Sequence, residues 1–144
     1  MLKFGIQNGL NVARLGLTED QILTACSLAD KTGYHSIWYM DHSNVPQWSK
    51  AIVNDPWVML AGIAAVTNNV ELGTCVTDAL RRHPSNIALA SITLDRLSKG
   101  RGTLGIGAGE AQNLKEFNIP FDKPVSKFEE QLQVIKQLYD SDPD

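Results

Sequence analysis

A glutamate that follows a glycine-rich segment is the residue best placed for chemistry in this sequence. The segment Gly100–Asn113 (GRGTLGIGAGEAQN) predicts a short apolar strand, Thr103–Ile106, that leads into glycines and one carboxylate, Glu110. Glycine lacks a Cβ, so a ligand can approach the backbone closely there. Folds with parallel strands place their chemistry just past the C-terminal strand ends, which makes Glu110 a candidate acid or base. The alternative is that Glu110 is a solvated residue in the first turn of the next helix.

Asp41 and His42 form a second candidate site. They directly follow Ser36–Met40 (SIWYM), which is apolar on both faces, as is typical of a buried parallel strand. Histidine suits proton transfer because its reference pKa lies near neutrality. His42 could therefore act as a general acid or base, with Glu110 orienting it or taking that role itself. The alternative is a polar turn without chemistry.

Alternating strands and helices must position these residues. The strands are predicted, in chain order, at Lys3–Gln7, Ser36–Met40, Val70–Thr77 and Thr103–Ile106. Helix starts are indicated by a capping box of Thr18 and Gln21, by Asp55-Pro56, by Pro84 with His83 as a cap, and by a second capping box of Ser126 and Glu129, whose helix ends near Tyr139. This alternation predicts a parallel sheet with right-handed crossovers.

The glycine pattern favours an α/β barrel of the TIM type, (β/α)₈, over a doubly wound sheet. No G-x-G-x-x-G motif follows the first strand, and the glycines after the fourth strand have a different spacing. A complete barrel takes about 250 residues, so we expect residues 1–144 to be one domain, a half-barrel with only the first four βα units. Alternatively, two half-barrels pair. The strand ends of a barrel share one mouth, where we expect Gln7, Asn8, Asp41, His42, Cys75–Asp78 and Gly107–Glu110.

Composition and charge narrow the class of protein. The chain is 43% hydrophobic and 20% charged, with a net charge of −3, which gives no reason to expect a nucleic-acid or membrane partner. Cys26 and Cys75 form neither a CxxC pair nor a disulfide framework, and His and Cys do not cluster at metal-ligand spacing. We therefore expect a cytoplasmic protein without a metal. Arg81 and Arg82 could meet an anionic coenzyme tail, although paired loop arginines are usually just solvated.

Several motifs in this order resemble the bacterial-luciferase-like superfamily. They are SIWYMDH and the stretch ELGTCVTDALRRHPSNIALASITLDRLSKGRGTLGIGAGEAQN, and the similarity extends from KFGIQ to FDKPVSKF. Within the superfamily the chain is most similar to the branch that uses the deazaflavin coenzyme F420. LDRLSKGRGTLGIGAGE and KPVS resemble methylenetetrahydromethanopterin reductase. GAGEA and TCVT also resemble F420-dependent secondary alcohol dehydrogenase and glucose-6-phosphate dehydrogenase.

The resemblance implies roles for particular residues. It implies catalytic roles for His42, Glu110 and Trp48, although Trp48 lies two residues further along than the matching tryptophan of the family. It implies a cis peptide bond at Cys75–Val76, behind the deazaflavin ring. The residues that it places against the coenzyme are Asp41, Cys75, Val76, Thr77, Gly107, Ala108 and Gly109. Two positions depart from the pattern of the pterin reductases, because Gln7 stands where they have a glutamate and Glu110 where they tend to have an aspartate. The carboxylic acid could instead come from Glu110.

These observations predict an oxidoreductase that transfers a hydride between F420 and a small organic substrate. That substrate would be methylene-tetrahydromethanopterin-like or an alcohol/carbonyl couple, with His42 exchanging the hydroxyl proton and Trp48 stabilising developing charge. Barrel phosphate sites usually follow strands seven and eight, so we expect activity to need the other half of the barrel and this half alone to bind coenzyme poorly. We also expect a homodimer. The alternatives are an FMN-dependent monooxygenase of the same superfamily and a non-catalytic half-barrel that serves in assembly.

Overall fold

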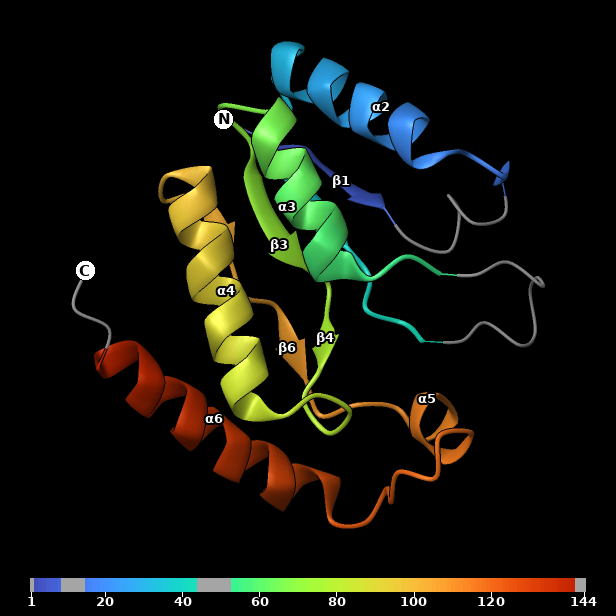
Figure 1. The fold of residues 1–144 in the computed structure, drawn as a ribbon, viewed down its shortest axis with the longest axis vertical. Helices are drawn as coiled ribbons and strands as arrows, with labels where there is room; N and C mark the ends of the chain where they lie inside the picture. The colour runs from blue at the N-terminus through green and yellow to red at the C-terminus, as the bar shows by residue number, and fades with distance from the viewer. Residues whose placement is uncertain (1, 9–14, 44–52, 142–144) are drawn as a thin grey trace.

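The computed structural model describes residues 2–8, 15–43 and 53–141, in which strands and helices alternate (Figure 1). The elements are β1 (Gly5–Asn8), α2 (Glu19–Lys31), β2 (Ser36–Tyr39), α3 (Pro56–Val66), β3 (Glu71–Thr74), β4 (Thr77–Asp78), α4 (Pro84–Ser98), β5 (Gly102–Thr103), β6 (Ile106–Gly107), α5 (Ala111–Lys115) and α6 (Pro124–Asp140). In this part of the chain no helix is both long and apolar enough to cross a membrane.

Four parallel strands form the main sheet, in the order β1-β2-β3-β5. Beyond β3 and β5 the chain continues into β4 and β6, which pair in parallel as a second, two-stranded sheet. The strands of the main sheet lie in chain order, β4 pairs with β6 just beyond β3 and β5, and all of the paired strands run in the same direction, so their C-terminal ends lie at the same edge. This is the parallel α/β arrangement predicted above.

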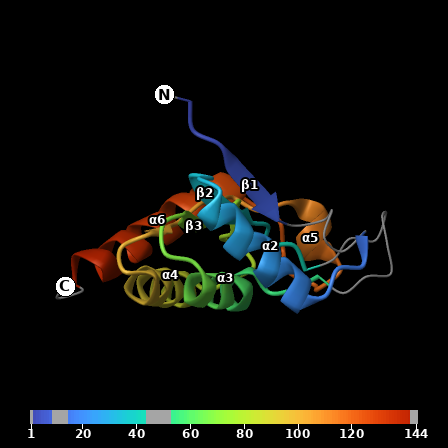
Figure 2. The same cartoon turned by 90° about the horizontal axis from the view of Figure 1, so that it is seen from above.

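One face of the sheet carries helices and holds the core. The helices α3 and α4 lie side by side on this face (Figure 2). The core between helices and sheet is made of Ile22, Cys26, Ala29, Ile37, Tyr39, Met59, Leu60, Ile63, Ala64, Val70, Leu72 and Leu94. A smaller cluster of Ile87, Ala88 and Ile135 joins α4 to α6. The strands β2 and β3 are largely buried, as expected of strands at the centre of a parallel sheet.

The opposite face of the sheet is hollow among the described residues. Trp38 lies across this face, with its indole Nε1 donating to Ser36 Oγ at 2.9 Å. A Cβ on Gly73 would lie 2.6 Å from Cζ3 of that ring. Gly5, Gln7, Ser36, Trp38 and Cys75 line a hollow of about 360 Å³ here. In a closed barrel this face is the interior, which side chains from all strands fill.

Two charged side chains hold the N-terminal ends of the strands. Asp30 accepts hydrogen bonds from the main-chain nitrogens of Asn69 and Val70, both at 2.8 Å. Burial raises the pKa of the Asp30 carboxyl, but these and neighbouring hydrogen bonds outweigh burial and lower it. Arg101 donates to the main-chain carbonyls of Val70 at 2.8 Å and Thr67 at 3.1 Å. These contacts hold the end of the sheet that lies away from the candidate residues.

Local capping signals explain where three of the helices begin. Thr18 and Gln21 form the predicted capping box of α2, with Gln21 N donating to Thr18 Oγ1 at 3.3 Å and Thr18 N to Gln21 Oε1 at 2.9 Å. Asp55 caps α3 by accepting from the main-chain nitrogens of residues 57 and 58. His83 caps α4, since its Nδ1 accepts from Ser85 N at 3.3 Å. These three predictions are confirmed.

The second capping box is wrong, and the predicted strand bounds need revision. Helix α6 begins at Pro124 after a left-handed Lys123 (φ 46°) that makes no side-chain cap bond, so Ser126 already lies within the helix. A proline needs no amide partner and suits a first helical position, which favours the earlier start. The predicted strand Val70–Thr77 is two strands, β3 and β4, and Thr103–Ile106 is divided between β5 and β6. A helix after Glu110 was raised only in the alternative for that residue, without bounds; the structure has α5 there.

Candidate active site

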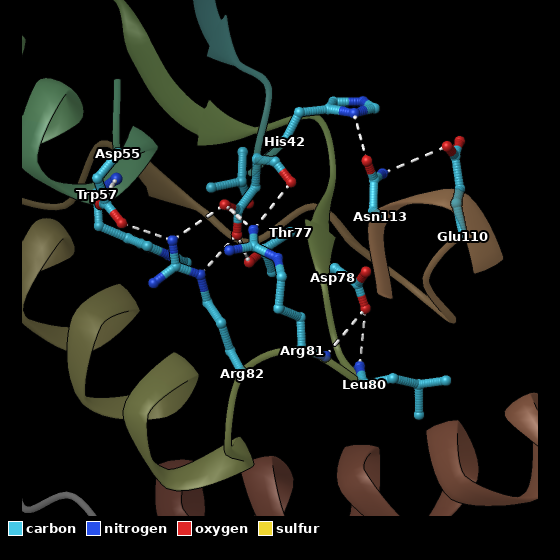
Figure 3. Close-up of polar contacts among 12 residues, drawn as sticks. His42, Asp55, Trp57, Thr77, Asp78, Leu80, Arg81, Arg82, Glu110 and Asn113 are labelled. Carbon is cyan, nitrogen blue, oxygen red and sulfur yellow. Dashed lines mark hydrogen bonds and ion pairs between the residues drawn. The ribbon is translucent and has the colours of Figure 1, made fainter. Parts of the chain in front are cut away.

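Three segments meet at the C-terminal edge of the sheet (Figure 3). The chain leaves β2 at Asp41 and His42. It leaves β3 through Cys75 and Val76 into β4, and it leaves β6 towards Glu110 and α5. Because these strands are parallel, the segments that follow them are held at one edge, as predicted.

His42 and Glu110 are connected through Asn113. The Nδ1 atom of His42 lies 3.2 Å from Asn113 Oδ1, and Asn113 Nδ2 donates to Glu110 Oε2 at 3.4 Å (Figure 3). Asn113 is buried on α5, whereas Glu110 is exposed and also accepts from Gln112 Nε2 at 2.6 Å. The structure thus brings the two predicted catalytic residues into one chain of contacts, without a direct contact between them.

This chain of contacts determines which nitrogen of His42 carries the proton. A carboxylate can only accept hydrogen bonds, so the amide nitrogen of Asn113 must face Glu110 and the amide oxygen must face His42. A carbonyl oxygen can only accept, so His42 Nδ1 is the donor in this pair. In the neutral imidazole, Nε2 is then left with a lone pair that can take a proton.

Asn113 is a functional candidate that our reading of the sequence did not include. It stands three residues after Glu110, and α5 begins between them. Residues three apart lie on the same face of a helix, so the spacing was a usable signal. The helix itself was raised only in the alternative for Glu110, without bounds that would have included Asn113.

Asp41 lies in a buried cluster with Thr77, Arg81 and Arg82. Its side chain is 1% exposed, and it accepts from Thr77 Oγ1 at 2.5 Å, from Arg82 Nε at 2.7 Å and from Arg81 Nη2. Burial raises the pKa of Asp41, but the hydrogen bonds from Arg82 and Thr77 and the charges of both arginines outweigh burial and lower it. A coenzyme contact with the Asp41 carboxylate would have to share these oxygens.

The two arginines face Asp41 rather than solvent, and their contact with an anionic coenzyme tail stays a prediction. Their side chains are 15% and 23% exposed, and both pair with Asp41. Arg82 also reaches Asp55 at 2.6 Å, and thereby connects the end of β2 to the start of α3. The expectation of simply solvated arginines is wrong, because the buried carboxylate of Asp41 attracts both of them.

The segment behind the predicted ring position has the expected backbone. The Cys75–Val76 peptide bond is cis, as the resemblance implies. Val76 is 49% exposed, so an aliphatic side chain faces the solvent at the mouth. Cys75 is half-buried, and its Sγ accepts from Gln7 Nε2 at 3.8 Å.

The glycines after β5 allow close contact between strands. A Cβ on Gly105 would collide with the carbonyl oxygen of Thr74, so glycine is required there by the neighbouring strand. Gly109 has a φ of 79° and lies against Asp78, whose Cγ would be 2.9 Å from a Cβ at that position. Contact of Gly107, Ala108 and Gly109 with a coenzyme stays a prediction.

Two further points concern the predicted site. Trp48 lies outside the described residues. Within the described ranges, no group of three or more His, Cys, Asp and Glu side chains could hold a metal ion.

Comparisons with known proteins identify relatives of this arrangement. The chain is 36% identical to phthiodiolone/phenolphthiodiolone dimycocerosates ketoreductase of Mycobacterium tuberculosis over an alignment 160 residues long, which covers 97% of this chain and 41% of that enzyme. It is 37% identical over 115 residues to F420-dependent glucose-6-phosphate dehydrogenase of Kineococcus radiotolerans, covering 77% of this chain and 34% of that enzyme. The chain therefore spans well under half the length of these curated relatives.

Solved structures agree with the fold. Monooxygenase RslO1 from Streptomyces bottropensis superposes with a TM-score of 0.81 at 27% identity, over 94% of this chain and 42% of that one. An F420-dependent secondary alcohol dehydrogenase in complex with an F420-acetone adduct superposes with a TM-score of 0.80 at 23% identity, over 97% and 42%. The prediction of a partial barrel is thereby confirmed. The model of the luciferase-like monooxygenase family matches residues 6–143, and this chain belongs to that family.

Proposed function

We propose that this chain forms the coenzyme-facing part of an F420-dependent oxidoreductase that acts on an alcohol/carbonyl couple in a small organic substrate. The contact of His42 with Glu110 through Asn113 is the observation that carries the proposal. Two similar enzymes are F420-dependent by name, a glucose-6-phosphate dehydrogenase and a secondary alcohol dehydrogenase, and a further relative is a ketoreductase. Gln7 cannot act as an acid, which favours the alcohol/carbonyl couple over pterin reduction.

The side chains at the mouth fit a deazaflavin ring. A planar ring needs an apolar surface on one side, and the half-exposed Val76 offers one. It also needs polar groups at its edge, and His42, Asn113 and Glu110 are such groups. When bound, F420 would supply a two-electron hydride acceptor or donor next to these residues.

The protein's own residues would handle the proton. His42 Nε2 takes the hydroxyl proton of an alcohol, or returns a proton to the oxygen of a carbonyl. Asn113 keeps Nδ1 in its donor state, so that Nε2 keeps its lone pair. Glu110 holds the amide of Asn113 in the required orientation. Trp48 would add stabilisation of developing charge.

An FMN-dependent monooxygenase is the second candidate. It is favoured by the family description and by the likeness to monooxygenase RslO1 at 27% identity. Flavin and deazaflavin rings have similar shapes, so the same apolar surface at Val76 would suit either of them.

A ligand titration of the labelled 144-residue chain separates the candidates. Coenzyme F420 and, separately, FMN are added while nuclear magnetic resonance follows the Val76 methyl and His42 ring signals. We expect weak, saturable shifts of both residues with F420 and smaller shifts with FMN. Val76→Asp, followed at the His42 ring alone, should abolish the ligand-induced shifts of that ring because it places a charge on the apolar surface. The matched Leu28→Asp, at an exposed leucine of α2, should leave them unchanged.

Other outcomes contradict the proposal. Larger shifts with FMN than with F420 would favour the monooxygenase. Shifts with neither ligand at millimolar concentration would favour a half-barrel without a catalytic role. Shifts that survive Val76→Asp would place the ligand elsewhere.

A further inference from the structure

We propose that Arg81 is a positioning residue, which sets the direction of the His42 side chain by holding the peptide group that precedes it. The inference rests on the proposed role of His42. Arg81 Nη2 donates to the main-chain carbonyl of Asp41 at 3.0 Å and also to the Asp41 carboxylate. That carbonyl belongs to the peptide unit that joins Asp41 to His42, so its direction determines the plane of the His42 amide.

His42 is then held at two points. Arg81 restrains its main chain through Asp41, and Asn113 restrains its ring at Nδ1, 3.2 Å away. A histidine held only at the ring could reach Asn113 from more than one backbone geometry. With both restraints, Nε2 is kept in one direction, and catalytic groups need such precise placement.

The turn that carries Arg81 is itself well supported. Asp78 Oδ1 accepts from the main-chain nitrogens of Leu80 at 2.9 Å and Arg81 at 3.2 Å (Figure 3). The same carboxylate packs against Gly109, the residue before Glu110. The turn therefore contacts the segment that carries His42 and the segment that carries Glu110, and it can hold the two segments in a fixed relative position.

Arg82 provides an internal comparison. It donates to the carboxylate of Asp41 from Nε at 2.7 Å and from Nη2 at 3.0 Å, and to Asp55. These contacts of Arg82 are with carboxylates, whereas Arg81 donates to the main-chain carbonyl of Asp41 as well. Both arginines therefore hold the Asp41 carboxylate, and Arg81 in addition holds the main chain before His42.

The test compares three Arg→Lys variants of the full chain without coenzyme. Lysine keeps the charge, but its ammonium lies one bond closer to the main chain than Nη2, the single nitrogen from which Arg81 reaches both Asp41 oxygens. Long-range ¹⁵N spectra report which ring nitrogen of His42 carries the proton, and the side-chain amide signals of Asn113 report its partner. We expect Arg81→Lys to lose the single Nδ1–H signature of His42 and to shift the Asn113 amide. We expect Arg82→Lys to keep both signals.

Arg101→Lys is the matched structural control. Arg101 also donates to main-chain carbonyls, at the opposite end of the sheet, so its loss should destabilise the fold without changing His42. Unchanged His42 signals in Arg81→Lys would overturn the inference, as would equal changes in Arg82→Lys or Arg101→Lys.

A measurement on the unsubstituted chain covers the case in which Arg81→Lys does not fold. The held guanidinium should show separate, slowly exchanging Nη2 hydrogens for Arg81, and His42 should show the scalar couplings of a single χ1 rotamer. Averaged signals for either residue would contradict the inference. No coenzyme is present in these experiments, so their failure is distinct from failure of the F420 titration.

Discussion

Replacing Asp41 by asparagine removes the one charge that two half-buried arginines share. The asparagine has nearly the same shape, so the change leaves packing intact and isolates the electrostatic contribution. Thr77 and both arginines would then face a neutral amide, whose nitrogen is a donor directed at other donors. The lost interactions are buried, because the Asp41 side chain is 1% exposed.

The size of the effect follows from the burial of the partners. Breaking a buried ion pair by removing one partner costs about 3–5 kcal/mol, since it leaves a charge without compensation. The arginines here are 15% and 23% exposed, and Arg82 keeps its second partner, Asp55. We therefore expect the lower end of that range, about 3 kcal/mol, for the loss in free energy of unfolding at pH 7.

The sign of the pH dependence follows from the lowered pKa of Asp41. A carboxyl whose pKa is lower in the folded state stabilises the fold above its unfolded pKa, about 3.9 for aspartate. That stabilisation is lost as the pH falls through the folded pKa. The difference in unfolding free energy between the unsubstituted chain and Asp41→Asn should thus be largest at neutral pH and shrink with acidification.

Urea denaturation followed by circular dichroism, from neutral pH to below pH 4, measures this difference. The control is Asp122→Asn, which breaks the exposed pair with Lys127 and should leave stability nearly unchanged at every pH. If Asp41→Asn is as stable as the unsubstituted chain, or if the difference does not depend on pH, the assignment of Asp41 as a buried, ionised partner of the arginines is refuted.

Two further predictions concern the backbone. Gly105→Ala should lower the free energy of unfolding by about 1–3 kcal/mol, because the new Cβ would press on the Thr74 carbonyl. In the control Gly62→Ala, inside α3, the new Cβ would lie 3.4 Å from a flexible leucine side chain, so the free energy of unfolding should rise by about 0.5–1 kcal/mol. Urea denaturation measures both variants, and equal effects would contradict the contact of Gly105 with Thr74. Thr18→Ala should lower the melting temperature through loss of about 1 kcal/mol of capping, whereas Ser126→Ala should not. A comparable loss in Ser126→Ala would show that Ser126 caps the helix after all, and would contradict the start of α6 at Pro124.

Much of the fold could be predicted because its signals are local. The capping residues of α2, α3 and α4 act within one helical turn, and the apolar strands alternate with the helices. The start of α6 was misplaced because two local signals competed there. Pro124 prevailed over Ser126, since the proline ring fits the first turn without any capping side chain.

The site was predicted less completely because its contacts are not local. His42 and Glu110 were predicted from the positions that follow strands, and the parallel sheet brings those positions together. Asn113 was missed, because its value depends on a five-residue helix that has little helical signal of its own. Gly107 and Gly109 were expected to let a ligand approach, which stays a prediction, whereas Gly105, inside the predicted fourth strand, is required by contact with Thr74.

The sequence by itself determined the order of strands and helices, most helix starts, and the family to which the chain belongs. Those properties depend on residues a few positions apart, and a pattern of types and spacing records them. Only the tertiary structure decided that Arg81 and Arg82 bind Asp41 across 40 and 41 positions, and that Asn113 contacts His42 across 71 positions and so connects it to Glu110. Such contacts depend on where the ends of parallel strands meet, and sheet packing, rather than any local preference, determines that position.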